Sequence, residues 1–194
     1  GDIFNVTGTH STNINANAGI DLIQFQTNGS GLTGSIDAGA GSDTVDFSLL
    51  SASVTVGIAD FTNVEIIKGS SANDTLIGSA AGSTFNIASS NTGSVDAVNF
   101  ISFETLQGGA GSDSFTMADG ASISALIGSS GDDSLDLSAF LSARSVVLTA
   151  GLADGFAGSD ASIGTFTGID NLTGSGQSDS LTGVDANSTW DVGL

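Results

Sequence analysis

Aspartate is the residue type of this chain best suited to chemistry, because carboxylate oxygens are hard ligands for hard cations such as Ca²⁺. The sequence has 194 residues, with 21 acidic side chains against two Lys and Arg, and it contains no cysteine. Five aspartates recur two places before an apolar residue, and this regular placement makes them candidate metal ligands. They are Asp43, Asp74, Asp113, Asp133 and Asp179.

These aspartates belong to an internal repeat. In each copy two apolar residues stand nine places apart, with a short stretch of Gly, Ser and Ala between them. The clearest copy runs from Leu106 to Phe115 and reads LQGGAGSDSF, and the other copies span residues 36–45, 67–76, 126–135 and 172–181. A longer repeat, offset by 105 residues, matches Phe85 to Trp190. Both repeats indicate duplication of a structural unit.

Short strands and tight turns must position these side chains. In segments such as residues 43–48, apolar and polar residues alternate with period two, so we expect Val45 and Phe47 to point inward. Glycine permits tight corners, and proline, which would interrupt a backbone ladder, is absent. The repeat predicts an all-β fold, a parallel β-solenoid (β-helix or β-roll) of roughly 20 residues per coil. We expect residues 1–194 to form one continuous solenoid, a segment of a longer repeat protein, with residues 150–162 as a surface loop.

The repeat resembles the nonapeptide G-G-x-G-x-D-x-U-x of RTX proteins, the haemolysin-type calcium-binding repeats of secreted bacterial toxins, lipases and adhesins. The chain is also similar in style to large bacterial β-strand-repeat surface proteins and filamentous haemagglutinin-like adhesins. The RTX resemblance implies secretion, folding in external calcium, and Ca²⁺ shared between stacked turns. Only residues 106–115 carry the full Gly-Gly-x-Gly-x-Asp form, and unequal gaps separate the copies.

The best candidate calcium site combines Asp113 and Asp133, which lie 20 residues apart and are expected on adjacent coils. Asp132 would assist, together with the backbone carbonyls of the turns at Gly111 and Gly131. A Ca²⁺ ion takes six to eight oxygens, which one isolated aspartate cannot supply. The alternative is that these aspartates cap glycine turns by accepting backbone N–H groups.

Composition excludes several classes of function. A net charge of −19, with Lys68 and Arg144 as the basic residues, excludes nucleic-acid binding and attraction to anionic membranes. No apolar run approaches the ~18 residues of a membrane span, so we expect no membrane insertion. We also expect no enzymatic activity, because His10 is the sole histidine and neither basic residue lies in a catalytic motif.

Two glutamates could be taken for the paired carboxylates of a glycosidase. Glu65 and Glu104 both end a recurring segment of the form Phe-x-x-apolar-acid, which also ends at Asp170. Because they occupy the same repeat position, we expect both glutamates to be structural members of a ladder.

Two functions remain open. The first is a non-enzymatic structural or adhesive rod, secreted or at a bacterial cell surface, which stacks head to tail on copies of itself or on neighbouring repeats. The likeness of Phe4-Asn5-Val6 to Trp190-Asp191-Val192 favours this stacking, and Trp190 is expected to point inward. The second is a calcium-dependent carbohydrate-binding module of a secreted enzyme or adhesin, with cell-surface glycans as partners.

Overall fold

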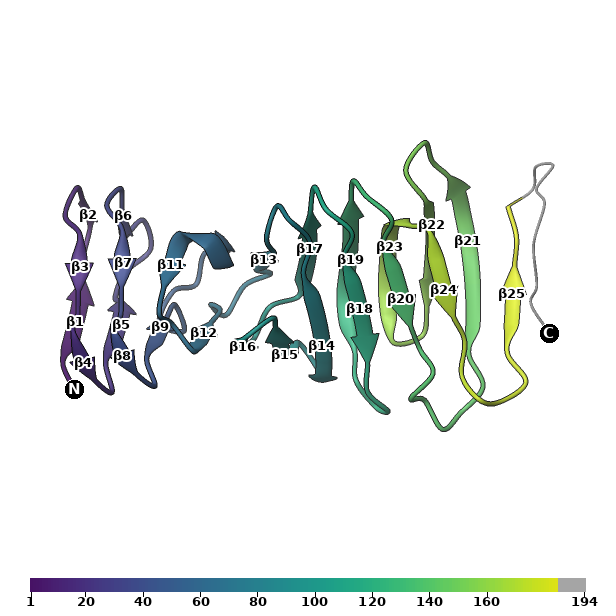
Figure 1. Ribbon diagram of the computed structural model, residues 1–194, viewed down its shortest axis with the longest axis horizontal. Helices are drawn as coiled ribbons and strands as arrows, with labels where there is room; N and C mark the ends of the chain where they lie inside the picture. The colour runs from purple at the N-terminus through teal and green to yellow at the C-terminus, as the bar shows by residue number, and fades with distance from the viewer. Residues whose placement is uncertain (185–194) are drawn as a thin grey trace.

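The computed structural model describes residues 1–184, and it is elongated, with β1 near one end and β25 near the other (Figure 1). The described residues form β-strands and one short 3₁₀ helix, η1 (Ile58–Asp60), but no α-helix. Most strand pairs are parallel. The prediction of an all-β fold with parallel pairing is therefore confirmed. None of the helical structure within these residues is long and apolar enough to cross a membrane.

Two large sheets run along the molecule. The first sheet contains, in spatial order, β1 (Ile3–Val6), β5 (Leu22–Phe25), β9 (Thr44–Asp46), β12 (Ile66–Lys68), β16 (Val98–Ile101), β15 (Thr92–Val95), β14 (Thr84–Ser89), β18 (Ser114–Met117), β20 (Ser134–Asp136) and β24 (Asn171–Thr173). The second sheet contains β10 (Thr55–Gly57), β13 (Thr75–Ile77), β17 (Thr105–Gly109), β19 (Ile123–Ser129), β23 (Ile163–Ile169), β22 (Phe156–Asp160), β21 (Ser145–Gly151) and β25 (Ser180–Thr182).

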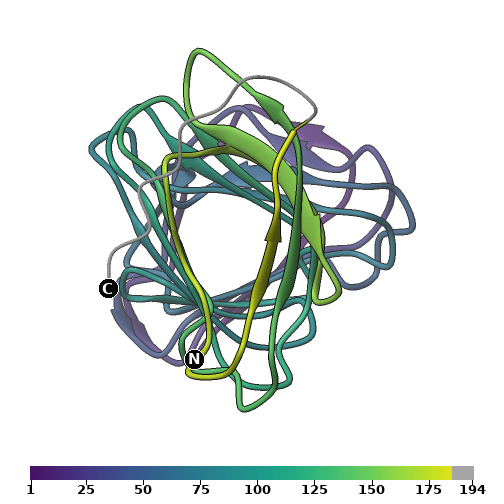
Figure 2. The same ribbon diagram turned by 90° about the vertical axis from the view of Figure 1, so that its right-hand side faces the viewer.

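Three small sheets complete the N-terminal part. The third sheet consists of β3 (Ile14–Asn15), β7 (Ile36–Asp37) and β11 (Phe61–Thr62). Two further pairs are β2 (Thr9–His10) with β6 (Gly31–Leu32), and β4 (Ala18–Gly19) with β8 (Ala40–Gly41). Viewed along the long axis, the chain passes around a central region that side chains fill (Figure 2).

We call each stretch of chain between successive strands of the first sheet a circuit. The first three circuits are residues 3–21, 22–43 and 44–65. The successive strands β5, β9 and β12 lie in register, so that Ile23 pairs with Val45 and Val45 pairs with Ile67. Later, Leu106 pairs with Leu126 and Phe115 with Leu135, each 20 residues on. The two apolar residues of the clearest repeat copy, Leu106 and Phe115, lie in different sheets. The nine-residue interval is therefore the chain length from one sheet to the other around a corner.

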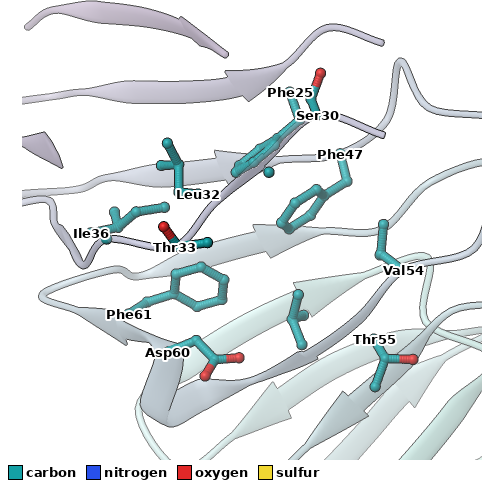
Figure 3. A pocket seen from close by; sticks show the side chains of 13 residues that line it. Phe25, Ser30, Leu32, Thr33, Ile36, Phe47, Val54, Thr55, Asp60 and Phe61 are labelled. Atoms are coloured by element: carbon teal, nitrogen blue, oxygen red, sulfur yellow. The ribbon is translucent and has the colours of Figure 1, made fainter. Parts of the chain in front are cut away.

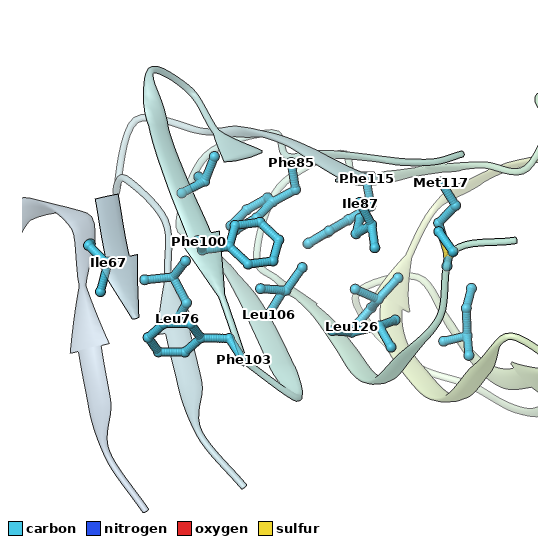
Figure 4. Close-up of a cluster of buried hydrophobic side chains, with 14 of the residues drawn as sticks. Ile67, Leu76, Phe85, Ile87, Phe100, Phe103, Leu106, Phe115, Met117 and Leu126 are labelled. Atoms are coloured by element: carbon cyan, nitrogen blue, oxygen red, sulfur yellow. The ribbon is translucent and has the colours of Figure 1, made fainter. Parts of the chain in front are cut away.

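The core is a continuous column of apolar side chains from these facing strands (Figure 4). Phe85 and Phe115 are fully buried, and their ring centroids lie 4.8 Å apart in a stacked arrangement. Val45 and Phe47 are also buried, as the period-two pattern predicts. The prediction for Trp190 lies outside the described residues.

The parallel arrangement is interrupted by two antiparallel strands, which the sequence does not reveal. β15 pairs antiparallel with β14 and β16, and β22 pairs antiparallel with β21 and β23. Residues 150–162, expected to be a surface loop, therefore contain a strand of the second sheet. In both insertions a glycine lies opposite a phenylalanine, Gly93 opposite Phe100 and Gly158 opposite Phe166. A Cβ atom on Gly158 would come within 2.6 Å of the Phe166 ring, so glycine makes room for the aromatic side chain.

Truncation of a column residue tests this core. We expect Leu126→Ala to lower the free energy of unfolding by about 2 to 5 kcal/mol, because Leu126 is fully buried and its truncation leaves a cavity. The same truncation at Leu141, which is 77% exposed, should change stability by less than about 0.5 kcal/mol. Urea denaturation followed by circular dichroism measures both, and equal effects would contradict a packed central column.

Candidate functional site

Carboxylate side chains gather where the chain enters the strands, and four of the five candidate aspartates are buried there. Asp43, Asp74 and Asp133 are 0% exposed and Asp113 is 2% exposed, whereas Asp179 is exposed. A buried carboxylate needs hydrogen-bond donors to offset the loss of water. Most of the donors in this structure are backbone N–H groups, and the Ser70 hydroxyl also donates to Asp74 Oδ1 at 2.8 Å.

Each of these carboxylates accepts the N–H group of the residue that precedes the neighbouring strand. Asp21 N–H donates to Asp43 Oδ1 at 2.7 Å, and Asp43 N–H donates to Glu65 Oε2 at 2.7 Å. Asp113 N–H donates in the same way to Asp133 Oδ1 at 2.7 Å, and Asp133 N–H donates to Asp170 Oδ2 at 2.9 Å. We call this arrangement the carboxylate ladder. Its acceptor residues are Asp21, Asp43, Glu65, Asp74, Glu104, Asp113, Asp133, Asp170 and Asp179.

The ladder explains the spacing of Gly and Asp in the repeat. The second oxygen of Asp113 accepts the N–H group of Gly109 at 2.7 Å, which closes the turn within its own circuit. A Cβ atom on Gly108 would lie 2.1 Å from this oxygen, and a Cβ atom on Gly128 would lie 2.4 Å from Asp133 Oδ2. Glycine five places before the aspartate therefore leaves the space that the carboxylate occupies.

The structure brings together the pair favoured for calcium. Asp113 and Asp133 lie on adjacent circuits, and the turns at Gly111 and Gly131 are stacked, since a Cβ atom on Gly131 would lie 2.6 Å from the Gly111 carbonyl oxygen. Asp132 is exposed, and its N–H group donates to the Ser112 hydroxyl at 3.3 Å.

The other three candidate aspartates lie at separate ladder positions. Asp43 is linked to Asp21 and Glu65, Asp74 to Glu104, and Asp179 to the N–H group of Arg144. Among residues 1–184, no group of three or more His, Cys, Asp or Glu side chains is arranged to hold a metal ion. Calcium binding stays a prediction.

The glutamates and the basic residues also have structural partners. Glu65 and Glu104 accept the N–H groups of Asp43 and Asp74, so they occupy equivalent ladder positions. Lys68 Nζ lies 3.6 Å from Asp46 on the adjacent strand of the first sheet. Arg144 is buried, forms an ion pair with Asp160 and lies over the Phe140 ring at 4.0 Å.

Two ladder members, Asp21 and Asp170, are absent from the set of site residues predicted from the sequence. Asp21 lies two places before Ile23, in the position of the other repeat aspartates, but the glycines around it are irregular. Asp170 ends the third Phe-x-x-apolar-acid segment, which was a usable signal. In both cases the acceptor role follows from the stacking of circuits rather than from the local sequence.

Three buried oxygens of the ladder have no hydrogen-bond partner within the described part of the chain. They belong to Asp21, Asp43 and Asp133 (Oδ2 in each case). Burial raises the pKa of Asp133 above its ordinary range, and the carboxylates of Asp113 and Asp170 add to the increase. Burial also raises the pKa of Asp113, against the lowering effect of the N–H groups of Gly109 and Ser83. The exposed Asp179 differs, because the N–H group of Arg144 and the Ser175 hydroxyl lower its pKa.

Comparison of the chain with protein-family models, curated proteins and solved structures finds no match.

The raised pKa of Asp133 leads to a test of the ladder by pH. A carboxyl whose folded pKa is above its unfolded value contributes stability below the unfolded pKa, and this contribution is lost as pH rises through the folded pKa. We expect Asp133→Asn, which cannot ionise, to gain less stability than the wild type between about pH 7 and about pH 4.5.

Asp132→Asn is the matched control, since it removes one negative charge at the adjacent, exposed position. It should keep the wild-type dependence on pH. Urea denaturation at the two pH values measures the change, and identical pH responses of the two variants would contradict the assignment to Asp133.

Proposed function

We propose that the chain is a parallel β-solenoid of roughly 20 residues per coil and that it serves as a structural or adhesive rod, without enzymatic activity. The observation that carries the proposal is the in-register stacking of circuits on a continuous apolar column, with acidic side chains committed to backbone N–H groups. In repeat proteins of this kind each unit is stabilised mainly by its neighbours. What such a sequence chiefly specifies is therefore the elongated shape of the molecule. The strongly acidic composition suits a secreted or bacterial cell-surface location, where divalent cations are available to bridge or screen the charge.

The first circuit supports stacking with further circuits. Its four strands, β1, β2, β3 and β4, each pair on one side only among the described strands. An unpaired strand edge is a template for another strand. We therefore propose that this end accepts either neighbouring repeats of a longer chain or a second copy.

The direction of the peptide groups in β1 provides a test. Along a β-strand the peptide groups of successive residues point to opposite sides. The carbonyl groups of Asp2 and Val6 accept hydrogen bonds from the second circuit, so the even-numbered residues of this strand face that circuit. The odd-numbered Asn5 therefore presents its N–H group to the open side. Asn5→Pro removes that donor, and proline is tolerated on an edge strand. Asn5→Ala is the matched control, because both variants lose the bond between Asn5 Oδ1 and the Gln26 side chain.

We expect the wild type and Asn5→Ala to associate end to end with rising protein concentration, and more strongly in added salt, which screens the net charge of −19. Asn5→Pro should associate less. Sedimentation velocity measures this, and a strictly monomeric wild type, or equal association of the two variants, would remove non-covalent stacking through β1.

The second candidate function, a calcium-dependent carbohydrate-binding module, is favoured by the three unpartnered buried oxygens. A cation would supply the charge compensation that Asp133 lacks. This candidate predicts heat on calorimetric titration with Ca²⁺, a higher melting temperature, and calcium-dependent signals on a glycan array.

The heat should disappear in Asp133→Asn and persist in Asp119→Asn, whose exposed carboxylate caps a separate turn. Absence of heat with the wild type would remove the calcium-dependent module and leave the rod.

A further inference from the structure

We propose that an opening in the wall of the molecule, between β6 and β10, binds an extended, cationic peptide segment by strand addition. The opening is a cavity of about 540 Å³, within the size range of ligand sites. The side chains of Phe25, Phe47 and Phe61 lie around it, with Leu32 on one side and Val54 on the other (Figure 3). Unlike end-to-end stacking, this inference concerns the side of the molecule.

The opening arises from a change in circuit length. From the first sheet to the third, the chain takes 9 residues in the first circuit (Asn5 to Ile14), 12 in the second (Gln24 to Ile36) and 15 in the third (Asp46 to Phe61). The second and third circuits pair directly in both of these sheets. Between these two sheets, however, the third circuit is longer than the second. Its strand β10 does not pair with β6 of the second circuit but with β13, and this pair begins the second sheet.

Both strands that border the opening have an unpaired edge. Among the described strands, β6 pairs only with β2, and β10 pairs only with β13. The N–H groups of Gly31 and Thr33 donate to the first circuit, at 3.1 and 2.9 Å, so the intervening Leu32 presents its peptide groups to the opening. Val54 accepts from Thr75 N–H at 2.9 Å, so Thr55 presents its peptide groups to the opening from the other side.

An open strand edge beside an apolar floor fits strand addition. In this mode of recognition, main-chain hydrogen bonds provide affinity and alternate side chains enter pockets. Proteins ordinarily cover or charge such edges, because they template further pairing. Here the edges are flanked by buried Phe25 and Phe47, whose rings stack at 4.5 Å, and by half-buried Leu32 and Phe61.

Charge indicates which peptide fits. Among the residues that line the opening, Asp60 is the charged one, and it is exposed. The whole chain has a net charge of −19, which attracts cationic partners and accelerates their association. A second copy is a poor source of such a strand, because it carries the same net charge of −19 and its basic residues are only Lys68 and the buried Arg144. The occupant is therefore a different chain, with apolar side chains facing inward and basic residues at its ends.

The probe is a fluorescein-labelled heptapeptide, Lys-Val-Thr-Leu-Thr-Val-Lys, which alternates polar and apolar residues. Two control peptides carry N-methyl groups on both threonines, or Glu in place of both Lys. We expect saturable binding by fluorescence polarisation with a micromolar dissociation constant. N-methylation should weaken binding about tenfold or more, because it removes main-chain donors, and the Glu peptide should bind less tightly in low salt.

Two variants of the protein locate the binding. Leu32→Ser, in the opening, should weaken binding about tenfold, whereas Leu152→Ser, which removes a half-exposed leucine from a distant loop, should leave it unchanged. Melting temperatures verify that both variants fold. In hydrogen exchange followed by NMR, the peptide should protect the amides of Leu32 and Thr55.

The proposal is overturned if no binding occurs up to about 1 mM peptide. It is also overturned if the N-methylated peptide binds equally well, which would indicate a pocket for an apolar small molecule. Unprotected amides at Leu32 and Thr55, or equal loss in the two serine variants, would likewise exclude strand addition at this opening.

Discussion

The architecture depends on one interaction, the hydrogen bond from the backbone N–H group that precedes a strand to a carboxylate of the neighbouring circuit. A parallel ladder satisfies the peptide groups inside the strands, but at the corners the chain turns and the ladder ends. Asp113 and Asp133 each supply a carboxyl oxygen as the acceptor at this point, and such a hydrogen bond is stronger when the carboxyl group is ionised than when it is neutral. The register of successive circuits is therefore fixed at the corners as well as by the apolar column.

This solution concentrates negative charge inside the molecule. Neighbouring ladder members are linked by one hydrogen bond, from the backbone N–H group of one residue to the carboxylate of the next. The negative charges of Asp113 and Asp170 therefore act on the carboxyl group of Asp133. Burial and like charge both disfavour ionisation, whereas the N–H donors favour it. This balance between burial and hydrogen bonding explains how an acidic composition can coexist with a well-packed apolar core.

Repeat spacing was sufficient to predict the all-β class, parallel pairing and the adjacency of Asp113 and Asp133, because register follows directly from equal chain lengths. It could not decide whether these aspartates face a metal or the backbone, since both arrangements place an aspartate in a glycine turn. The antiparallel strands were missed because Gly93 and Gly158 differ from turn glycines only through the phenylalanines opposite them. The opening beside β6 depends on arc lengths outside the repeat copies.

The two antiparallel insertions have a consequence for the straightness of the molecule. The first insertion adds two strands to the first sheet, while the second sheet gains none at that level. The first sheet is therefore extended along the long axis by about 10 Å relative to the second. Alone, such a wedge would bend the long axis. The second insertion adds two strands to the opposite sheet further along, which tilts the axis back. Insertions that alternate between sheets thus let a repeat protein vary its sequence without acquiring a permanent curve (Figure 1).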